Sequence, residues 1–160
     1  MTEEKNSVLS LRLTSEDRFL VRIGLEERTG ETYYLGLDPE NAGMPMSVTR
    51  GLNLLLKGWL HVLESINDGD LIYLPFDFSD EYTRWVACQM TGHDIHIVMG
   101  WAAVEGWAIS PSNFESHARS VSQFQPDEPL TVQSFYLPRF LSELRREIGK
   151  FEARLRSATA

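Results

Sequence analysis

Apolar residues alternate with polar ones near the start of the chain, which is the period-two pattern of strands with one face on a core. The alternation runs over residues 9–13 and resumes over residues 19–25. We place a turn at Thr29-Gly30-Glu31 and a third strand from Thr32 to Leu37. Residues 38–45, which contain two prolines and a glycine, should form a surface loop.

A helix is predicted next, with Ser47 as its N-cap. Gly51 and Gly58 each cost about 1 kcal/mol relative to alanine in a helix interior, so packing must stabilise this helix. A close approach to the sheet at Gly58 would explain that glycine. The apolar stripe repeats at steps of four and three and comprises Val48, Leu52, Leu55, Trp59, Val62 and Ile66.

Residues 71–109 read as consecutive strands joined by tight turns. The predicted strands are Leu71–Phe78, Tyr82–Met90 and Ile95–Ala103, with a return through Trp107 and Ile109. Pro75 cannot donate to a ladder, so it indicates an edge strand or a bulge.

A short strand within residues 130–136 and a final helix from Pro138 complete the chain. The helix has an apolar stripe, and we expect its charged residues, including Glu143 and Glu147, to form a solvated face. The stripe comprises Leu141, Leu144, Ile148, Phe151 and Leu155.

This order of elements predicts an α+β fold. We expect a largely antiparallel, meander-like sheet of about six to eight strands with two long amphipathic helices packed on one face. Residues 7–157 should form a single domain, with a disordered segment at 1–6 and a frayed end at 158–160. The alternating βαβ rhythm of a doubly wound nucleotide-binding fold is missing.

Charge narrows the classes of partner. The formal net charge of −8 argues against nucleic acid, whose recognition rests on a basic surface. An acidic balance fits a basic protein partner, but it also keeps a protein soluble without any partner.

Localisation follows from what the sequence lacks. The polar start argues against a secretory signal, and the longest apolar run is too short to cross a bilayer. The single cysteine, Cys88, cannot form an internal disulfide and should be an inert buried thiol. We therefore expect a cytoplasmic protein with no membrane partner.

One end of the predicted meander collects acidic and aromatic residues. Carboxylates beside aromatic rings can anchor a basic side chain of a partner through charge pairing and cation–π contact. The alternative is that the tryptophans pack under the helices and the acids are ordinary loop residues. The candidate partner-binding residues are Asp77, Asp80, Glu81, Tyr82, Trp101, Glu105 and Trp107.

Catalytic chemistry has no clear signature in this sequence. His93 lies about 30 Å along the sheet from the acidic end, and His96 should point to the opposite face from His93. No serine-nucleophile elbow or phosphate-binding loop occurs. We therefore expect no catalytic residue, no metal site and no cofactor.

Our leading hypothesis is a small acidic protein-binding module without enzymatic activity, resembling immunity or antitoxin proteins in its role, or else regulatory. Two alternatives stay open. One is an enzyme or small-ligand binder whose site is assembled from residues distant in sequence, and the other is a structural homodimer.

Overall fold

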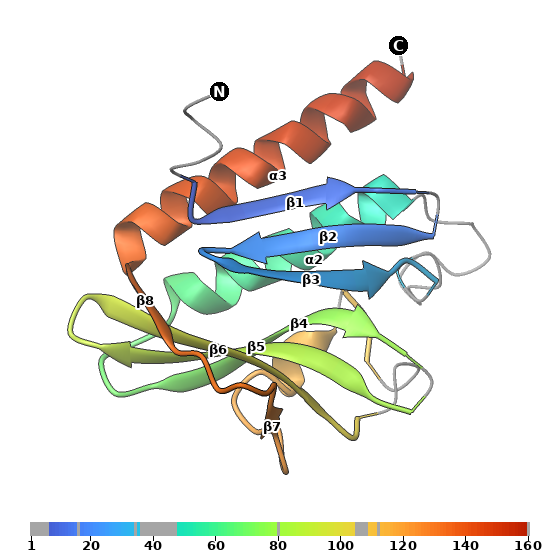
Figure 1. The fold of residues 1–160 in the computed structure, drawn as a ribbon. Coiled ribbons are helices and arrows are strands. Elements are labelled where there is room, and N and C mark those ends of the chain that lie inside the picture. The colour runs from blue at the N-terminus through green and yellow to red at the C-terminus, as the bar shows by residue number, and fades with distance from the viewer. Residues whose placement is uncertain are drawn as a thin grey trace.

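The computed structural model of this chain describes residues 7–15, 17–33, 35, 48–79, 81–104, 109–111 and 113–159. These residues form two antiparallel sheets, of three and five strands, and two long helices (Figure 1). The α+β class, the approximate strand number and the helices packed against sheet are therefore as predicted. The eight strands are divided between two sheets, however.

The first sheet is a plain antiparallel meander in the order β1-β2-β3. Phe19, Val21 and Ile23 of β2 are buried, whereas the residues between them are at least partly accessible. This is the period-two alternation seen in the sequence. The strands are β1 (Leu9–Leu13), β2 (Arg18–Ile23) and β3 (Glu26–Glu31).

The third strand begins earlier than predicted. The chain turns at Gly24 and Leu25, and β3 occupies residues 26–31, so the turn proposed at Thr29-Gly30-Glu31 is wrong. Gly24 has φ +58°, a conformation that favours glycine. Gly30 lies within β3 opposite Phe19, and the Phe19 ring occupies the space that a side chain at position 30 would need. Half of the strand proposed at Thr32–Leu37 lies outside the described residues, and the described half, Thr32, Tyr33 and Leu35, is not in a strand, so that prediction is wrong there.

The second sheet carries the stretch from residue 71 to residue 102. Its order is β4-β5-β6-β7, and β8 also pairs with β6. Pro75 lies on edge strand β4, at a register shift between Pro75 and Asp77. The edge strand and the bulge that this proline indicated therefore both occur. The strands are β4 (Leu71–Phe78), β5 (Thr83–Thr91), β6 (Asp94–Ala102), β7 (Gln125–Pro126) and β8 (Gln133–Tyr136).

In Figure 1, α2 lies behind the three-stranded sheet and α3 runs along its β1 edge, and the two helices pack on each other. Gly58 does allow a close approach, but to a different neighbour from the one expected: a side chain there would lie 2.4 Å from the Phe114 ring. In the described part of the chain, no helix is long and apolar enough to cross a membrane. The helical elements of the described residues include α2 (Val48–Glu64), the short 3-10 helix η4 (Phe114–Ser116) and α3 (Leu137–Thr159).

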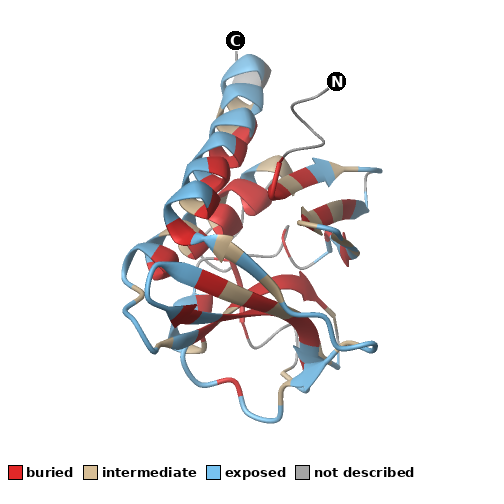
Figure 2. Cartoon of the chain, turned by 60° about the vertical axis from the view of Figure 1, so that its left-hand side comes forward, coloured by how far each residue is buried: buried red, intermediate tan, exposed pale blue. Residues whose placement is uncertain are grey.

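Buried side chains of both sheets and both helices form one continuous core. Figure 2 shows α3 buried along its inner side and exposed along its outer side. Trp59 of α2 is fully buried, and its indole N–H donates to the Pro75 carbonyl oxygen at 2.8 Å. This bond ties the helix layer to the edge of the second sheet.

The outer edge of β1 is sealed by two carboxylates of α3. Glu143 Oε1 accepts from the amides of Val8 (2.6 Å) and Leu9 (3.3 Å), and Glu147 Oε1 accepts from the amide of Leu11 (2.9 Å). Four residues along a helix span a distance similar to that of two or three residues along a strand. The spacing of the two carboxylates on α3 therefore matches the spacing of the amides that they accept from.

The expectation that these two glutamates lie on a solvated helix face is therefore wrong. Glu143 is 8% exposed and Glu147 is 1% exposed. Lys150 Nζ lies 2.9 Å from Glu147 Oε2 and compensates its charge. The free amides of an edge strand are costly to bury unpaired, which is why charged acceptors are tolerated here.

Candidate functional site

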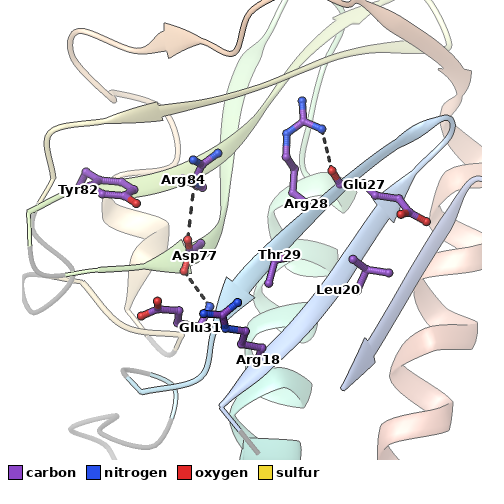
Figure 3. Close-up of a pocket in the computed structure, with 9 residues that line it drawn as sticks. All are labelled: Arg18, Leu20, Glu27, Arg28, Thr29, Glu31, Asp77, Tyr82 and Arg84. Atoms are coloured by element: carbon purple, nitrogen blue, oxygen red, sulfur yellow. Dashed lines mark hydrogen bonds and ion pairs between the residues drawn. The ribbon is translucent and has the colours of Figure 1, made fainter. Parts of the chain in front are cut away.

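A groove runs between the two sheets, alongside the outer edge of β3. Its volume is about 490 Å³, within the range of about 300–1,000 Å³ that is usual for ligand pockets. Figure 3 shows its side chains coming from β2 and β3 on one side and from β4 and the start of β5 on the other. The lining residues are Arg18, Leu20, Glu27, Arg28, Thr29, Glu31, Asp77, Tyr82 and Arg84.

Strand register explains why charged side chains gather in this groove. Arg84 of β5 stands opposite Asp77 of β4 and opposite Trp101 of β6. Residues opposite one another in an antiparallel ladder share a face of the sheet. This end of the face is thus polar and aromatic, whereas its continuation toward Val86 and Cys88 is buried.

A chain of ion pairs crosses from one sheet to the other. Arg28 Nε lies 2.9 Å from Asp127 Oδ2, and Arg28 Nη1 lies 2.9 Å from Glu26 Oε2. The same Asp127 oxygen lies 3.7 Å from Arg84 Nη1, and Arg84 Nε lies 3.8 Å from Asp77 Oδ2. The positive charges of Arg28 and Arg84 are therefore compensated within the protein.

Asp77 joins the two sheets. Its side chain is buried, and Oδ1 accepts a hydrogen bond from the Glu31 amide at 3.0 Å. Burial raises the pKa of Asp77, and it outweighs the Glu31 amide and the Arg84 charge, which act in the other direction. This carboxylate is already engaged, so it offers less to a partner than the exposed Glu81 nearby.

The Tyr82 ring lines the groove and contacts a second aromatic ring, Trp101. The Tyr82 and Trp101 rings meet edge to face, with centroids 6.3 Å apart and an interplanar angle of 72°. The guanidinium carbon of Arg84 lies 5.9 Å from the centre of the Tyr82 ring. Trp101 is 41% exposed. Tryptophan, tyrosine and arginine are the residues that most often dominate the binding energy of protein interfaces.

Four of the seven candidate residues lie in the described part of the chain: Asp77, Glu81, Tyr82 and Trp101. The structure places all four at one end of the second sheet, and brings Tyr82 into contact with Trp101. Asp80, Glu105 and Trp107 lie outside the described residues. The described tryptophans divide between the two alternatives. Trp101 is accessible, whereas Trp59 and Trp85 are core residues.

Sequence reasoning missed Arg84, Arg28 and Asp127. Arg84 gave a usable signal, because it is the one charged residue within the apolar run Thr83–Met90. Asp127 gave none. It reaches Arg28 across 99 residues of sequence, and spacing cannot indicate such a contact.

The opposite end of the sheet is occupied by turn contacts. Asp68 Oδ1 accepts from the Gly92 amide at 2.8 Å, and Asp70 Oδ2 pairs with Arg119 at 3.1 Å. Within the described residues, no group of three or more His, Cys, Asp or Glu side chains could hold a metal ion. Cys88 is fully buried, as expected, and its burial raises the pKa of the thiol.

Comparison with known proteins yields a likeness of fold. No protein-family model matches the chain, and no curated protein matches its sequence. Among solved structures, it resembles a chain of the CdiA-CT/CdiI toxin and immunity complex from Enterobacter cloacae. The TM-score is 0.52 at 11% identity, over 87% of this chain and 97% of the other. At that identity the likeness concerns the fold.

Proposed function

We propose that this chain is a protein-binding module without enzymatic activity, of the kind that binds and neutralises a toxin. The supporting observation is the likeness of its fold to a chain of a toxin and immunity complex. The groove end supplies a surface with the composition of an interface centre: the accessible Trp101, its neighbour Tyr82, and Arg84.

The chemistry of the exposed side chains favours a basic partner. Glu27, Glu31 and Glu81 are exposed, as is Arg18 of β2. The other two arginines of the groove, Arg28 and Arg84, are compensated by Asp127, Glu26 and Asp77, so three exposed carboxylates face one exposed arginine. A lysine or arginine of the partner would meet accessible carboxylates beside an aromatic surface.

Substitution of Trp101 tests the binding face. Trp101→Ala should weaken capture of a protein partner from the native host by at least about thirtyfold, because truncating such a residue costs about 2 kcal/mol or more. Tyr136→Ala is the matched control. Tyr136 of β8 is also an accessible aromatic residue, 56% exposed. It pairs with Asp94, at the end of β6 opposite to Trp101. Equal capture by both variants would contradict the proposed face.

Neutralisation needs its own measurement. The captured protein should arrest growth when expressed alone, and co-expression of this chain should restore growth. Co-expression of the Trp101→Ala variant should restore it less. A partner without toxicity would leave a binding module but would contradict the toxin-neutralising role.

A small-ligand binder is the second candidate, and the groove favours it because six charged side chains converge there. Thermal shift measurements with amino acids and small carboxylates distinguish the two functions. A ligand that raises the melting temperature of the wild type, but not of the Arg18→Ala variant, would support this candidate.

A further inference from the structure

The outer edge of β3 differs from the other long strand edges that face away from their sheets. The β1 edge is occupied by Glu143 and Glu147. The β4 edge is interrupted by Pro75, whose carbonyl is bonded to Trp59. Proteins usually block such edges because free backbone groups invite another strand to pair. The β3 edge instead opens on the groove.

Two hydrogen bonds reveal which backbone groups of β3 point outward. The Glu31 amide donates to Asp77 Oδ1, away from β2, and the Glu27 carbonyl accepts from Arg28 Nη1 at 2.8 Å. Backbone groups of alternate residues point to the same side of a strand. The amide and carbonyl of Thr29, midway between them, therefore also point outward.

Thr29 is exposed, and in the described part of the chain no hydrogen bond engages these two groups. An incoming strand could exchange both bonds with Thr29. The Glu27 amide would supply a further donor. Toward Glu31 the edge is closed by Asp77, so the available edge is short and suits an extended segment of a few residues.

The side chains beside this edge define the chemistry of the occupant. Glu27 and Glu31 flank Thr29 on the groove side of the sheet, and both are exposed. Neither carboxylate forms an ion pair with another described residue. In an added strand, the residues opposite Glu27 and Glu31 would lie four apart, with one residue opposite Thr29 between them.

We propose that an extended, basic segment of a protein partner adds to β3 as a fourth strand, with both Thr29 backbone groups bonded and a lysine or arginine opposite Glu27. Main-chain bonds give such complexes their affinity, and alternate side chains give them their specificity. This inference rests on the proposed protein-binding function and names the part of the partner that occupies the groove.

A short peptide tests the edge directly. The probe is acetyl-Lys-Val-Thr-Val-Lys-amide, added to the isotope-labelled full chain and followed by nuclear magnetic resonance. The amide signals of Thr29 and Glu27 should shift, and hydrogen exchange at Thr29 should slow. The same peptide methylated on the nitrogen of its central threonine should bind about tenfold more weakly, because one main-chain bond is lost.

Variants separate the backbone from the side chains. Thr29→Pro removes the outward amide and should abolish the peptide-induced shifts, whereas Thr29→Val keeps that amide and should preserve them. Glu27→Lys keeps the backbone intact and should reverse the preference, so that the peptide with glutamates in place of its lysines binds better. The Glu27→Lys measurement remains decisive if Thr29→Pro fails to fold.

The outcomes are distinct from those for the proposed function. Unchanged Thr29 and Glu27 signals, or equal binding of the methylated peptide, would overturn strand addition even if a toxin partner is captured. Peptide binding at β3 without any toxin partner would support the edge site and would count against the toxin-neutralising role.

Discussion

The two outer edges of the first sheet differ in how their backbone groups are bonded. At β1, Glu143 and Glu147 accept the outward amides, so the strand is bonded on both sides. At β3, Asp77 accepts one outward amide near the end of the strand and leaves Thr29 facing the groove. Both edges use carboxylates, but Glu143 and Glu147 are buried, whereas Asp77 leaves the middle of the β3 edge accessible.

Proline at each edge gives the sharpest contrast between them. Leu11→Pro removes the amide that donates to Glu147 and leaves a buried carboxylate oxygen without its donor. We therefore expect the free energy of unfolding to fall by about 3 kcal/mol or more. Thr29→Pro removes an amide that faces the groove and should cost about 1 kcal/mol, since edge strands tolerate proline.

Urea denaturation of the two proline variants measures the contrast. Leu11→Ala is the control for the lost side chain at β1, because it keeps the amide. Equal destabilisation by the two prolines would show that the β3 edge is as closely bonded as the β1 edge.

Removal of the sealing carboxylates is the next largest change. Each hydrogen bond to a charged group contributes about 1.5–3 kcal/mol, so the double variant Glu143→Ala/Glu147→Ala should lose about 3 kcal/mol or more in urea denaturation. Glu152→Ala is the matched control on α3. Glu152 pairs with Lys57 at the surface, and its loss should change stability little. A double variant as stable as this control would contradict the sealing role.

Neutral analogues of the two kinds of carboxylate should differ in their effect at pH 7. Burial alone would raise the pKa of Glu143, but hydrogen bonds from Ser7 and from the amides of Val8 and Leu9 outweigh it and lower that pKa. Glu143→Gln should therefore destabilise by about 1–2 kcal/mol. Asp77→Asn should cost less, because burial already disfavours the charged form of Asp77.

The pH dependence of stability should separate the same two residues, with opposite signs. The stabilisation from Glu143 is present above its unfolded pKa of about 4.3 and is lost as the pH falls through its lower folded value. The contribution of Asp77 is present below its unfolded pKa of about 3.9 and is lost as the pH rises through its higher folded value.

Unfolding free energies between pH 3 and pH 7 provide the measurement. The deficit of Glu143→Gln relative to wild type should shrink toward acid. Asp77→Asn should compare least favourably with wild type in acid. A deficit of Glu143→Gln that stays constant across this range would contradict the lowered pKa of Glu143.

Local periodicity accounts for most of what the sequence could predict. The strands around β5 and β6 and both long helices follow from spacings of two, three and four residues. The third strand was misplaced because Leu25 extends the apolar alternation in sequence. In the structure Leu25 lies in the turn between β2 and β3 and is 96% exposed. It therefore does not continue the buried face of β2.

The sealed edge was predictable in part. Phe140, Leu144, Glu147 and Phe151 follow steps of four, three and four and are all buried, so Glu147 occupies a position of the buried stripe. An acid in such a position needs a buried partner. The partner itself, the amide of Leu11, lies 136 residues away, and no local pattern indicates it.

The candidate site divides in the same way. Alternation along β5 and β6 brought Tyr82 and Trp101 to one end of the sheet, and their ring contact follows from strand register. The groove depends on how the first sheet is placed against the second. The contacts of Asp77 and Asp127 with residues of β3 contribute to that placement, and they have no signature in spacing.

The seal on β1 also imposes an order on biosynthesis. A ribosome that adds about 5–20 residues per second reaches α3 on the order of ten seconds after β1, because Ser7 and Glu143 are 136 residues apart. During that interval the edge of β1 lacks its acceptors. A nascent chain stalled before α3 should therefore be bound by chaperones along residues 9–13, and release of the finished helix should end that binding.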